Sequence, residues 1–596
     1  MNAVQGRARA RRPLVAVGLA VASVLAVSGC SSNAAPDAAT GAQGEPKTGG
    51  VLKVVGGSDI GSFDPIAARS TGIFTHRAIT RQLYVLPTSE DETEAQTPVA
   101  DLATGAPEVN AEGTEYTITI RDGAQWDTEP ARQITAEDAI RGFKRLCNPA
   151  RPGGSLDNYI GVIEGLKVYC DGFAEVAGEV EPMKEYVENN QVSGLTADGQ
   201  TLKITLEAPA NDFDYVLTQL GIVPMPVESL DYMPDSPEFR QNYVASGPYR
   251  IKEYVADQRL ALERNPAWDS ASDPYRKGYI DGVEIIMNNP DPGKVQRLIE
   301  SGEADSYFDA SVPTADLQRL MAIDDPQLRQ FADGALNPYL LINQQSPKND
   351  GALSNKKVRE ALNYAADKAA MVQVGGGPEV KFPHHQILTS AVAGYEPFNL
   401  YETEGDEGDP EKAKQLLAEA GYPDGIELNF VYAAGSRYDA YAQALEPGLR
   451  AAGFRVNLMP TPGDNIDGQF VLNSEATAAG AWDITLRAIS PKWIGNGART
   501  MLMPGFYGEN CENSTTNPTC YSNPEINVLM EEARAEIDVD TAAELWAGVD
   551  RALMEDAAAV PLISGEISLY QSKRLMDGAI NVGFNNIEPG LVWLND

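Results

Sequence analysis

The stretch DPEKAKQLLAEAGYPDGIELNFVY, residues 409–432, places a helix directly before a strand. Asp409 suits the N-cap, Pro410 suits the first helical position, and Gly421 supplies a residue type that commonly ends helices. The apolar segment IELNFVY that follows predicts a buried strand. This stretch therefore predicts one helix–strand unit of an α/β fold.

Helix and strand alternate again on either side of this stretch. Residues 354–372 (SNKKVREALNYAADKAAMV) predict a capped helix, and residues 438–460 (YDAYAQALEPGLRAAGFRVNLMP) predict a helix that ends at Gly453 before a strand. We expect Pro447 to kink the second helix. The first half of the chain instead alternates strands and turns, as in TEYTITIRDGAQW, residues 114–126. These patterns predict an α/β protein of mixed sheets flanked by helices.

The composition favours a large acidic protein with more than one hydrophobic core. The 596 residues include 85 acidic and 47 basic side chains, and 43% are hydrophobic. A chain of this size exceeds what one core usually organises, so we expect two or three domains. The formal charge of −38 argues against a nucleic-acid partner, because phosphate binding needs basic patches.

The N-terminal region has the pattern of an export signal. Four arginines within residues 7–12 precede the apolar run of residues 14–29, which is shorter than the ~20 residues of a membrane-spanning helix. The sequence VSGC resembles the bacterial lipobox, which implies that residues 1–29 are a lipoprotein signal peptide and that Cys30 carries a lipid. The alternative is an uncleaved anchor helix, and the Sec and Tat export routes both remain open. Residues 30–48 are small and polar, which predicts a flexible tether.

Four cysteines remain after Cys30, and in an exported chain we expect them to form disulfides. Three pairings are possible. Pairing Cys147 with Cys170 and Cys511 with Cys520 closes two local loops, and we prefer it. A zinc site is disfavoured because the cysteines lack CxxC spacing and the chain has only three histidines.

The sequence contains no recognisable motif for catalysis. It lacks GxSxG, a Walker A loop, HExxH and GxGxxG. Its histidines, His76, His384 and His385, do not supply a catalytic triad or a metal cage. The PHHQ segment at 383–386 could bind a metal such as nickel, but it is more typical of a loop. We therefore expect no enzyme activity, catalytic residue, metal site or cofactor, with a secreted hydrolase and a surface adhesin as alternatives of other classes.

A series of short segments runs in order from Gly49 to Trp593, including GGVLKVV, SFDP, YTITIRDGAQW, TAEDAIRGFKRLCNP, TLKITLEAP, SGPYRI, LERNPAW, YIDGVEI, NKKVREALNYAADK, DPEKAKQLLAEAGYPDG and AVPLI. Together these segments resemble the extracellular solute-binding proteins of the peptide/nickel group, the receptors of bacterial ABC importers. Each segment is weak alone. In this order they cover essentially the whole chain after the tether.

The resemblance implies a two-lobe periplasmic-binding-protein clamp with an extra third domain. Domain I would comprise residues 49–85, 206–305 and 562–596, domain II the insertion 86–205, and domain III residues 306–561. Crossover strands near 306–310 and 558–564 would form a hinge, with the ligand between domains I and III. The protein would be a monomeric receptor, lipid-anchored in the cell envelope, that passes a small solute or short peptide to an ABC permease.

The stretch AWDITLRAISPKWIGNGART, residues 481–500, is basic within an acidic chain. In peptide-binding members of the family, this place carries G-W-x-x-D, whose Asp would pair with the α-amino group of the ligand. Counting from Asp483 puts Lys492 at the Asp position, which we prefer, and counting from Trp493 puts Asn496 there.

Neither alternative is an acid, and a buried ammonium without a carboxylate partner is costly. We therefore expect a ligand that has no free amine at this place, or one that offers a carboxylate, a phosphate or hydroxyl groups. Peptide remains the first expectation. An oligosaccharide, an acidic metabolite and a metal chelate are the alternatives.

Other residues are weaker candidates for ligand contacts. Trp493 could form a stacking wall, and Arg437 and Arg487 could each bind a carboxylate through two parallel hydrogen bonds. The resemblance places further residues near the cleft, namely Ser62, Phe63, Ser246, Gly247 and Tyr249. We expect Asp483 to secure its strand rather than to contact the ligand.

Overall fold

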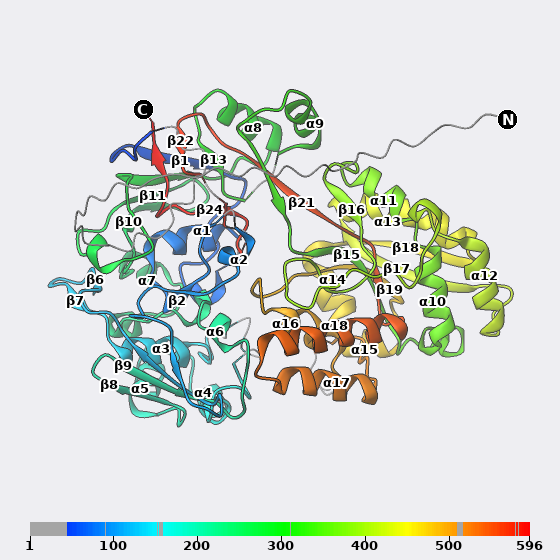
Figure 1. The fold of residues 1–596 in the computed structure, drawn as a ribbon, viewed down its shortest axis with the longest axis horizontal. Helices are drawn as coiled ribbons and strands as arrows, with labels where there is room; N and C mark the ends of the chain where they lie inside the picture. Colours follow the sequence, from blue (N-terminus) through cyan, green and yellow to red (C-terminus); the bar gives the residue numbers. More distant parts are fainter. Residues whose placement is uncertain are drawn as a thin grey trace, which may run out of the picture. The chain divides into compact units, whose positions relative to one another are not determined.

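The computed structural model describes residues 44–595, apart from positions 69, 90, 152, 154–155, 157–158, 310–311, 509–516, 579 and 582. The predicted signal peptide, Cys30 and most of the tether lie outside the described residues. From Pro46 onward the chain forms one compact unit, whose helices and strands are labelled in Figure 1. None of the described helices is both long enough and apolar enough to cross a membrane.

Region I is built on a five-stranded mixed sheet with the order β10-β11-β12-β1-β13. Its strands are β1 (Val51–Val55), β10 (Tyr249–Val255), β11 (Arg259–Arg264), β12 (Gly282–Ile286) and β13 (Ser306–Tyr307). β1 runs parallel to β12 and β13, whereas β10, β11 and β12 are antiparallel. The hydrophobic core of this region also includes residues from α1 (Ser70–Ile79), α8 (Pro292–Glu300), α9 (Thr314–Ala322) and the C-terminal segment.

Region I extends further along the chain than the resemblance implies. Ser306 of β13 pairs with Val54 of β1, and two leucines of α9 pack into the same core. The crossover expected at 306–310 therefore lies later in the chain. The chain leaves this core through β14 (Leu328–Ala332) and returns through β21 (Ile563–Tyr570), the long red strand in Figure 1. These two strands pair antiparallel.

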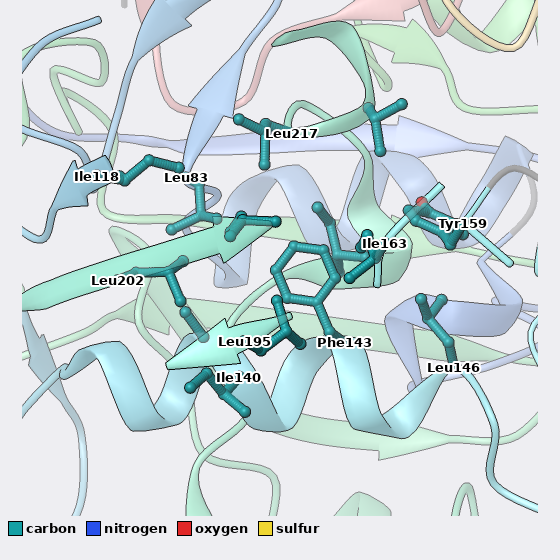
Figure 2. Packing of buried hydrophobic residues seen from close by; sticks show 14 of the residues in the cluster. Leu83, Ile118, Ile140, Phe143, Leu146, Tyr159, Ile163, Leu195, Leu202 and Leu217 are labelled. Carbon is teal, nitrogen blue, oxygen red and sulfur yellow. The ribbon is translucent and has the colours of Figure 1, made fainter. Parts of the chain in front are cut away.

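Region II corresponds to the predicted insertion and contains the antiparallel sheet β4-β5-β9-β8. The elements of its sheet and first helix are β4 (Glu108–Val109), β5 (Glu115–Thr119), β8 (Leu195–Asp198), β9 (Thr201–Thr205) and α3 (Ala136–Arg145). Figure 2 shows Ile140 and Phe143 of α3 packed close to Leu195 and Leu202 of the sheet. The core of region II continues past the predicted boundary at residue 205, as far as Ile222.

Helices α4 (Leu166–Ala174) and α5 (Val180–Asn189) complete region II. A disulfide joins Cys147, just after α3, to Cys170 on α4, with the Cα atoms 4.9 Å apart. This is one of the two pairs that the sequence spacing favours. Cys520 is also disulfide-bonded, but Cys511 lies outside the described residues, so their pairing stays a prediction.

Region III has the mixed sheet β18-β17-β19-β15-β20 at its centre. Its strands are β15 (Leu336–Ile342), β17 (Ile426–Ala434), β18 (Phe454–Pro462), β19 (Ile484–Ile489) and β20 (Val560–Pro561). β17 runs parallel to β18 and β19, whereas β15 is antiparallel to β19. Successive side chains of a strand point to opposite faces, so Leu340 enters one hydrophobic core while Leu341 enters another.

Helices contribute to the cores on both faces of this sheet. One core includes residues of α10 (Lys356–Ala365), α11 (Lys368–Val374), α12 (Pro410–Glu419) and α13 (Arg437–Ala451), and the other includes residues of α16 (Ala498–Phe506), α17 (Pro524–Ala535) and α18 (Val539–Glu555). Asp409 caps α12 by accepting a hydrogen bond from Lys412 N, and Gly421 follows this helix with a φ of 96°. α13 continues through Pro447 without ending there. The architecture is α/β with mixed sheets and flanking helices, as predicted.

Candidate functional site

The loop between β19 and α16 connects region III to region II. Asp483 anchors the start of β19, since its carboxylate accepts hydrogen bonds from Ser346 Oγ at 2.5 Å and from Asn429 N at 2.6 Å. Further along, Trp493 and Ile494 pack into the hydrophobic core of region II. The loop is therefore held by region III at one end and by region II near the other.

Two cavities adjoin this loop. The first, which we call the lysine cavity, has a volume of ≈ 200 Å³ and includes Lys492 and Trp493 in its wall. The second, which we call the strand cavity, has a volume of ≈ 350 Å³ and includes Ile494 together with residues 329–332 of β14. Consecutive residues of one loop thus contribute to the walls of both cavities.

The lysine cavity has cationic, polar and apolar side chains in its wall, and no carboxylate among the described lining residues. Its charged and polar side chains are Arg77, Gln82, Tyr159, Thr218, Gln219, Lys492 and Asn581. Its larger apolar side chains are Ile66, Ile73, Leu86, Leu146, Leu220, Trp493 and Phe584. A wall without acids stands out in a chain that has 85 acidic and 47 basic residues.

Lys492 is exposed at this wall and makes no ion pair within the described part of the chain. Its backbone N donates to Thr500 Oγ1 at 3.0 Å, which fixes the main chain but leaves the ammonium free. Trp493 is buried, its indole Nε1 donates to Asn496 O at 3.0 Å, and the Arg499 guanidinium lies 5.6 Å from its ring centroid. Trp493 therefore serves both the cavity wall and the core of region II.

Asn496, the other candidate for the position of the family's Asp, lies in neither cavity wall. Its side-chain amide donates to Asn211 O at 2.8 Å and to Asn211 Oδ1 at 3.2 Å. The nearby Arg499 Nε donates to Asp212 Oδ2 at 2.7 Å. These contacts tie the loop to region II, so of the two alternatives only Lys492 faces a cavity.

The two arginines expected to bind a carboxylate also lie outside these cavity walls. Arg437 is the exposed first residue of α13. Arg487 of β19 already has a partner, because its Nη1 donates to Asp467 Oδ1 at 2.6 Å. Neither arginine lines these two cavities, and a contact of either with a ligand stays a prediction.

The SGPY turn, placed near the cleft by the resemblance, instead packs within region I. Ser246 Oγ accepts a hydrogen bond from Arg81 N at 2.9 Å. A Cβ atom at Gly247 would lie 2.6 Å from Ala78 O, so the turn lies directly against the end of α1. Tyr249 is fully buried in β10. The turn therefore has a packing role in this structure.

Ser62 and Phe63, in the loop after β1, line neither cavity, although Pro65 and Ile66 a few residues later line the lysine cavity. Ser62 bonds within its own turn, where its Oγ donates to Asp64 O at 3.2 Å and accepts from Asp64 N at 3.0 Å. Phe63 is buried, with its ring centroid 4.9 Å from that of Tyr254 in an edge-to-face arrangement. Of the predicted ligand contacts, only Lys492 and Trp493 line either cavity.

Sequence reasoning missed the contributions of α1, region II and the C-terminal segment to the lysine cavity. Arg77 of α1 is paired with the buried Glu588, to whose Oε2 its Nε donates at 2.7 Å. The Arg77 guanidinium also lies 5.1 Å from the centroid of the Phe584 ring. Tyr159 of region II is buried, and its hydroxyl has no hydrogen-bond partner among the described residues. No spacing in the sequence marks these residues, because the fold assembles them from distant segments.

The three histidines are held neutral by burial and do not form one group. Burial lowers the pKa of His76 to about 3, and that of His384 and His385 to about 4. Lys368 Nζ donates to His384 O at 2.8 Å and lies 3.2 Å from His385 Nδ1, so a cation opposes metal binding at the PHHQ segment. Within the described ranges, no three His, Cys, Asp or Glu side chains form a possible metal-ligand group.

Comparison with known proteins finds relatives along most of the chain. A family model described as bacterial extracellular solute-binding proteins, family 5 Middle, matches residues 97–505. Heme-binding protein A of Haemophilus influenzae is 29% identical over 342 residues, which are 54% of this chain and 54% of that protein. The periplasmic oligopeptide-binding protein of Salmonella typhimurium is 26% identical over 464 residues, covering 75% of this chain and 76% of that protein.

Solved structures share the fold over nearly the whole chain. Clavulanic acid biosynthesis oligopeptide binding protein 2 aligns with a TM-score of 0.80 at 23% identity, over 92% of this chain and 96% of that chain. The Haemophilus influenzae oligopeptide-binding protein in complex with the peptide RPPGFSPFR aligns with a TM-score of 0.68 at 18% identity, over 92% and 100% of the two chains. These similarities confirm the periplasmic-binding-protein fold.

Proposed function

Since the chain belongs to the bacterial extracellular solute-binding proteins of family 5, we propose that it is a receptor that captures a short peptide outside the membrane and delivers it to an ABC importer. Residues 1–29 would direct export. A lipid on Cys30 would then hold the receptor at the membrane through the tether. Binding would act by population shift, with the solute stabilising the closed form that the permease recognises.

The observation that carries the peptide proposal is the open edge of β14 in the wall of the strand cavity. Among the described strands, β14 pairs with β21 alone. Glu566 of β21 donates its N–H to Val380 O, on the side away from β14. Ala332 of β14, which lies opposite Glu566, is therefore in a non-hydrogen-bonded pair with it. Gln330, two residues earlier, is in the same kind of pair with Ser568.

The backbone N–H and C=O groups of Gln330 and Ala332 consequently point outward from the free edge of β14. An extended peptide can pair with such an edge, because its main chain supplies the hydrogen bonds whatever its side chains are. The rest of the wall includes the small or apolar residues Ala95, Ala391 and Ile494. Such a wall suits peptides of varied sequence.

The walls of the two cavities favour binding over hydrolysis. Their described lining residues include no Asp, Glu or His, the side chains that most often act as general acids and bases or activate a serine nucleophile. The alternative within the same receptor role is a non-peptide solute, since one relative is named for heme. An oligosaccharide, a small acid and a metal chelate remain in the same alternative.

Thermal melting of the chain from Ser31 onward tests this function against a panel of tri- to pentapeptides, oligosaccharides, heme and small acids. A solute at 100 times its Kd stabilises the folded state by about 2.7 kcal/mol, which shifts the melting temperature measurably. Shifts with peptides support the proposal, and shifts with other solutes alone support the alternative. Turnover of a panel compound would indicate a hydrolase, and the absence of any shift would overturn the receptor role for these solutes.

A further inference from the structure

The lysine cavity contains two polar groups that the proposed pairing of a peptide with β14 does not use. One is the ammonium of Lys492, and the other is the hydroxyl of Tyr159. Both belong to the wall of a cavity that has no acid among its described lining residues. The chemistry of these two groups indicates what the cavity would accept.

The excess positive charge of this cavity comes from Lys492 and not from Arg77. Arg77 Nε donates to Glu588 Oε2 at 2.7 Å, and its Nη1 donates to Gln82 Oε1 at 3.1 Å, so its charge is already balanced by a buried carboxylate. Lys492 has no carboxylate partner in the described part of the chain. The wall therefore offers one uncompensated cation.

Tyr159 gives an independent indication of a ligand. Its side chain is 2% exposed, and burial raises the pKa of its hydroxyl well above the ordinary value, so the group stays a hydrogen-bond donor. Figure 2 places Tyr159 near Leu146 at one end of the region II core. The hydroxyl oxygen is not among the fully buried side-chain atoms that lack a partner, so it is accessible from the cavity that Tyr159 lines. An acceptor atom in the cavity would therefore give this donor a hydrogen-bond partner.

Other polar side chains of this wall already have hydrogen-bond partners within the protein. Gln219 Nε2 donates to Tyr215 O at 3.3 Å, and Asn581 Nδ2 donates to Leu86 O at 3.0 Å. The apolar wall residues, among them Phe584 and Trp493, leave an apolar space beside the cation. The occupant must therefore combine a compact anion with an apolar body.

We propose that the lysine cavity binds a carboxylate attached to an apolar or aromatic group, with Lys492 as its counter-ion and the Tyr159 hydroxyl as a donor. One free cation matches the single charge of a carboxylate, whereas a phosphate carries up to two charges and three acceptor oxygens. The cavity of ≈ 200 Å³ is smaller than the ~300–1,000 Å³ of sites for drug-sized ligands. In terms of the proposed function, on which this step rests, the group is the C-terminal residue of a captured peptide.

Calorimetric titration with matched acid and amide probes tests this assignment. The probes are Ala-Ala-Phe and its C-terminal amide, together with 3-phenylpropionate and its amide. We expect the acids to bind roughly 10- to 100-fold more tightly than the amides, because hydrogen bonds to charged groups are the stronger ones. Lys492→Gln should remove this preference, and Tyr159→Phe should weaken acid binding roughly 3- to 10-fold.

Lys203→Gln is the matched control, because Lys203 is exposed on β9 and lies in neither cavity wall. Unchanged melting temperatures would show that each variant folds. If acid and amide peptides bind equally in the wild type and in Lys492→Gln, the carboxylate assignment is overturned while the receptor function stands. If no peptide binds but 3-phenylpropionate binds through Lys492, the peptide function fails and the assignment stands. Failure of every probe overturns the assignment.

Discussion

Arg499 donates through Nε to Asp212 Oδ2 at 2.7 Å, and this ion pair joins α16 of region III to region II. Asp212 is buried, and only 15% of the Arg499 side chain is exposed. Beside them, Asn496 donates to Asn211. The position of the loop that carries Lys492 therefore depends on contacts with region II as much as on β19.

We expect Arg499→Gln to loosen this loop, because it leaves the Asp212 carboxylate buried without a charged partner. Hydrogen exchange of the backbone amides at 495–500 should become roughly 10- to 100-fold faster. Arg450→Gln is a suitable control, since Arg450 pairs with Glu446 on an exposed face, where such pairs contribute at most ~1 kcal/mol. Equal exchange rates in the two variants would show that the buried pair does not hold the loop.

A second prediction concerns the open edge of β14. Gln330→Pro removes an N–H that points away from β21, and proline is tolerated at such edge positions. We expect the variant to keep its melting temperature but to lose the stabilisation by peptides. Phe331→Pro is the contrasting variant, because Phe331 lies in the alternate, hydrogen-bonded pairs with β21 and its replacement should destabilise the fold. Full peptide binding by Gln330→Pro would contradict the edge-pairing proposal.

Local signals predicted local structure well. Asp409 caps the start of α12 and Gly421 follows its end, as expected, because helix caps depend on residues close in sequence. Asp483 secures its strand, also as expected, because its buried carboxylate accepts a backbone hydrogen bond from the neighbouring strand. The ligand contacts were harder to predict. Asn496 bonds to region II instead of lining a cavity, because the loop that carries it packs into the core of region II. Tyr159 lines the lysine cavity from a segment distant in sequence, and such a placement depends on the tertiary fold.

The neutral buried His76 predicts a specific loss of stability in acid. Burial lowers its pKa to about 3 in the folded state, against 6.5 for the ordinary side chain, so only the unfolded chain takes up a proton between these values. Its contribution to stability is complete above pH 6.5 and is lost as the pH falls toward 3. Across this range the loss approaches about 1.4 kcal/mol per pH unit.

His76→Gln removes the side chain that takes up this proton when the chain unfolds. We expect its free energy of unfolding, measured by urea titration, to fall less steeply than that of the wild type between pH 6.5 and 4.5. The difference between the two curves isolates His76, because both proteins share every carboxylate. Parallel curves would mean that His76 is protonated in the folded state as readily as in the unfolded one.

The last prediction concerns a buried ionic network between regions I and II. Asp101 Oδ1 accepts from Arg81 Nε at 2.8 Å, and its Oδ2 accepts from Arg276 Nη1 at 2.8 Å. All three side chains are at most 1% exposed. Asp101→Asn leaves two buried guanidinium groups with one carboxylate fewer, so we expect a loss of about 3–5 kcal/mol.

The urea midpoint of unfolding measures this loss, with Asp281→Asn as the matched control. Asp281 pairs with Arg264 at the surface, where 60% and 43% of the two side chains are exposed, so its replacement should cost less than about 1 kcal/mol. Asp101→Leu combined with Arg276→Met should recover part of the loss, because removing both partners leaves fewer uncompensated charges than removing one. A double variant that is less stable than Asp101→Asn would show that packing, rather than charge balance, controls this part of the fold.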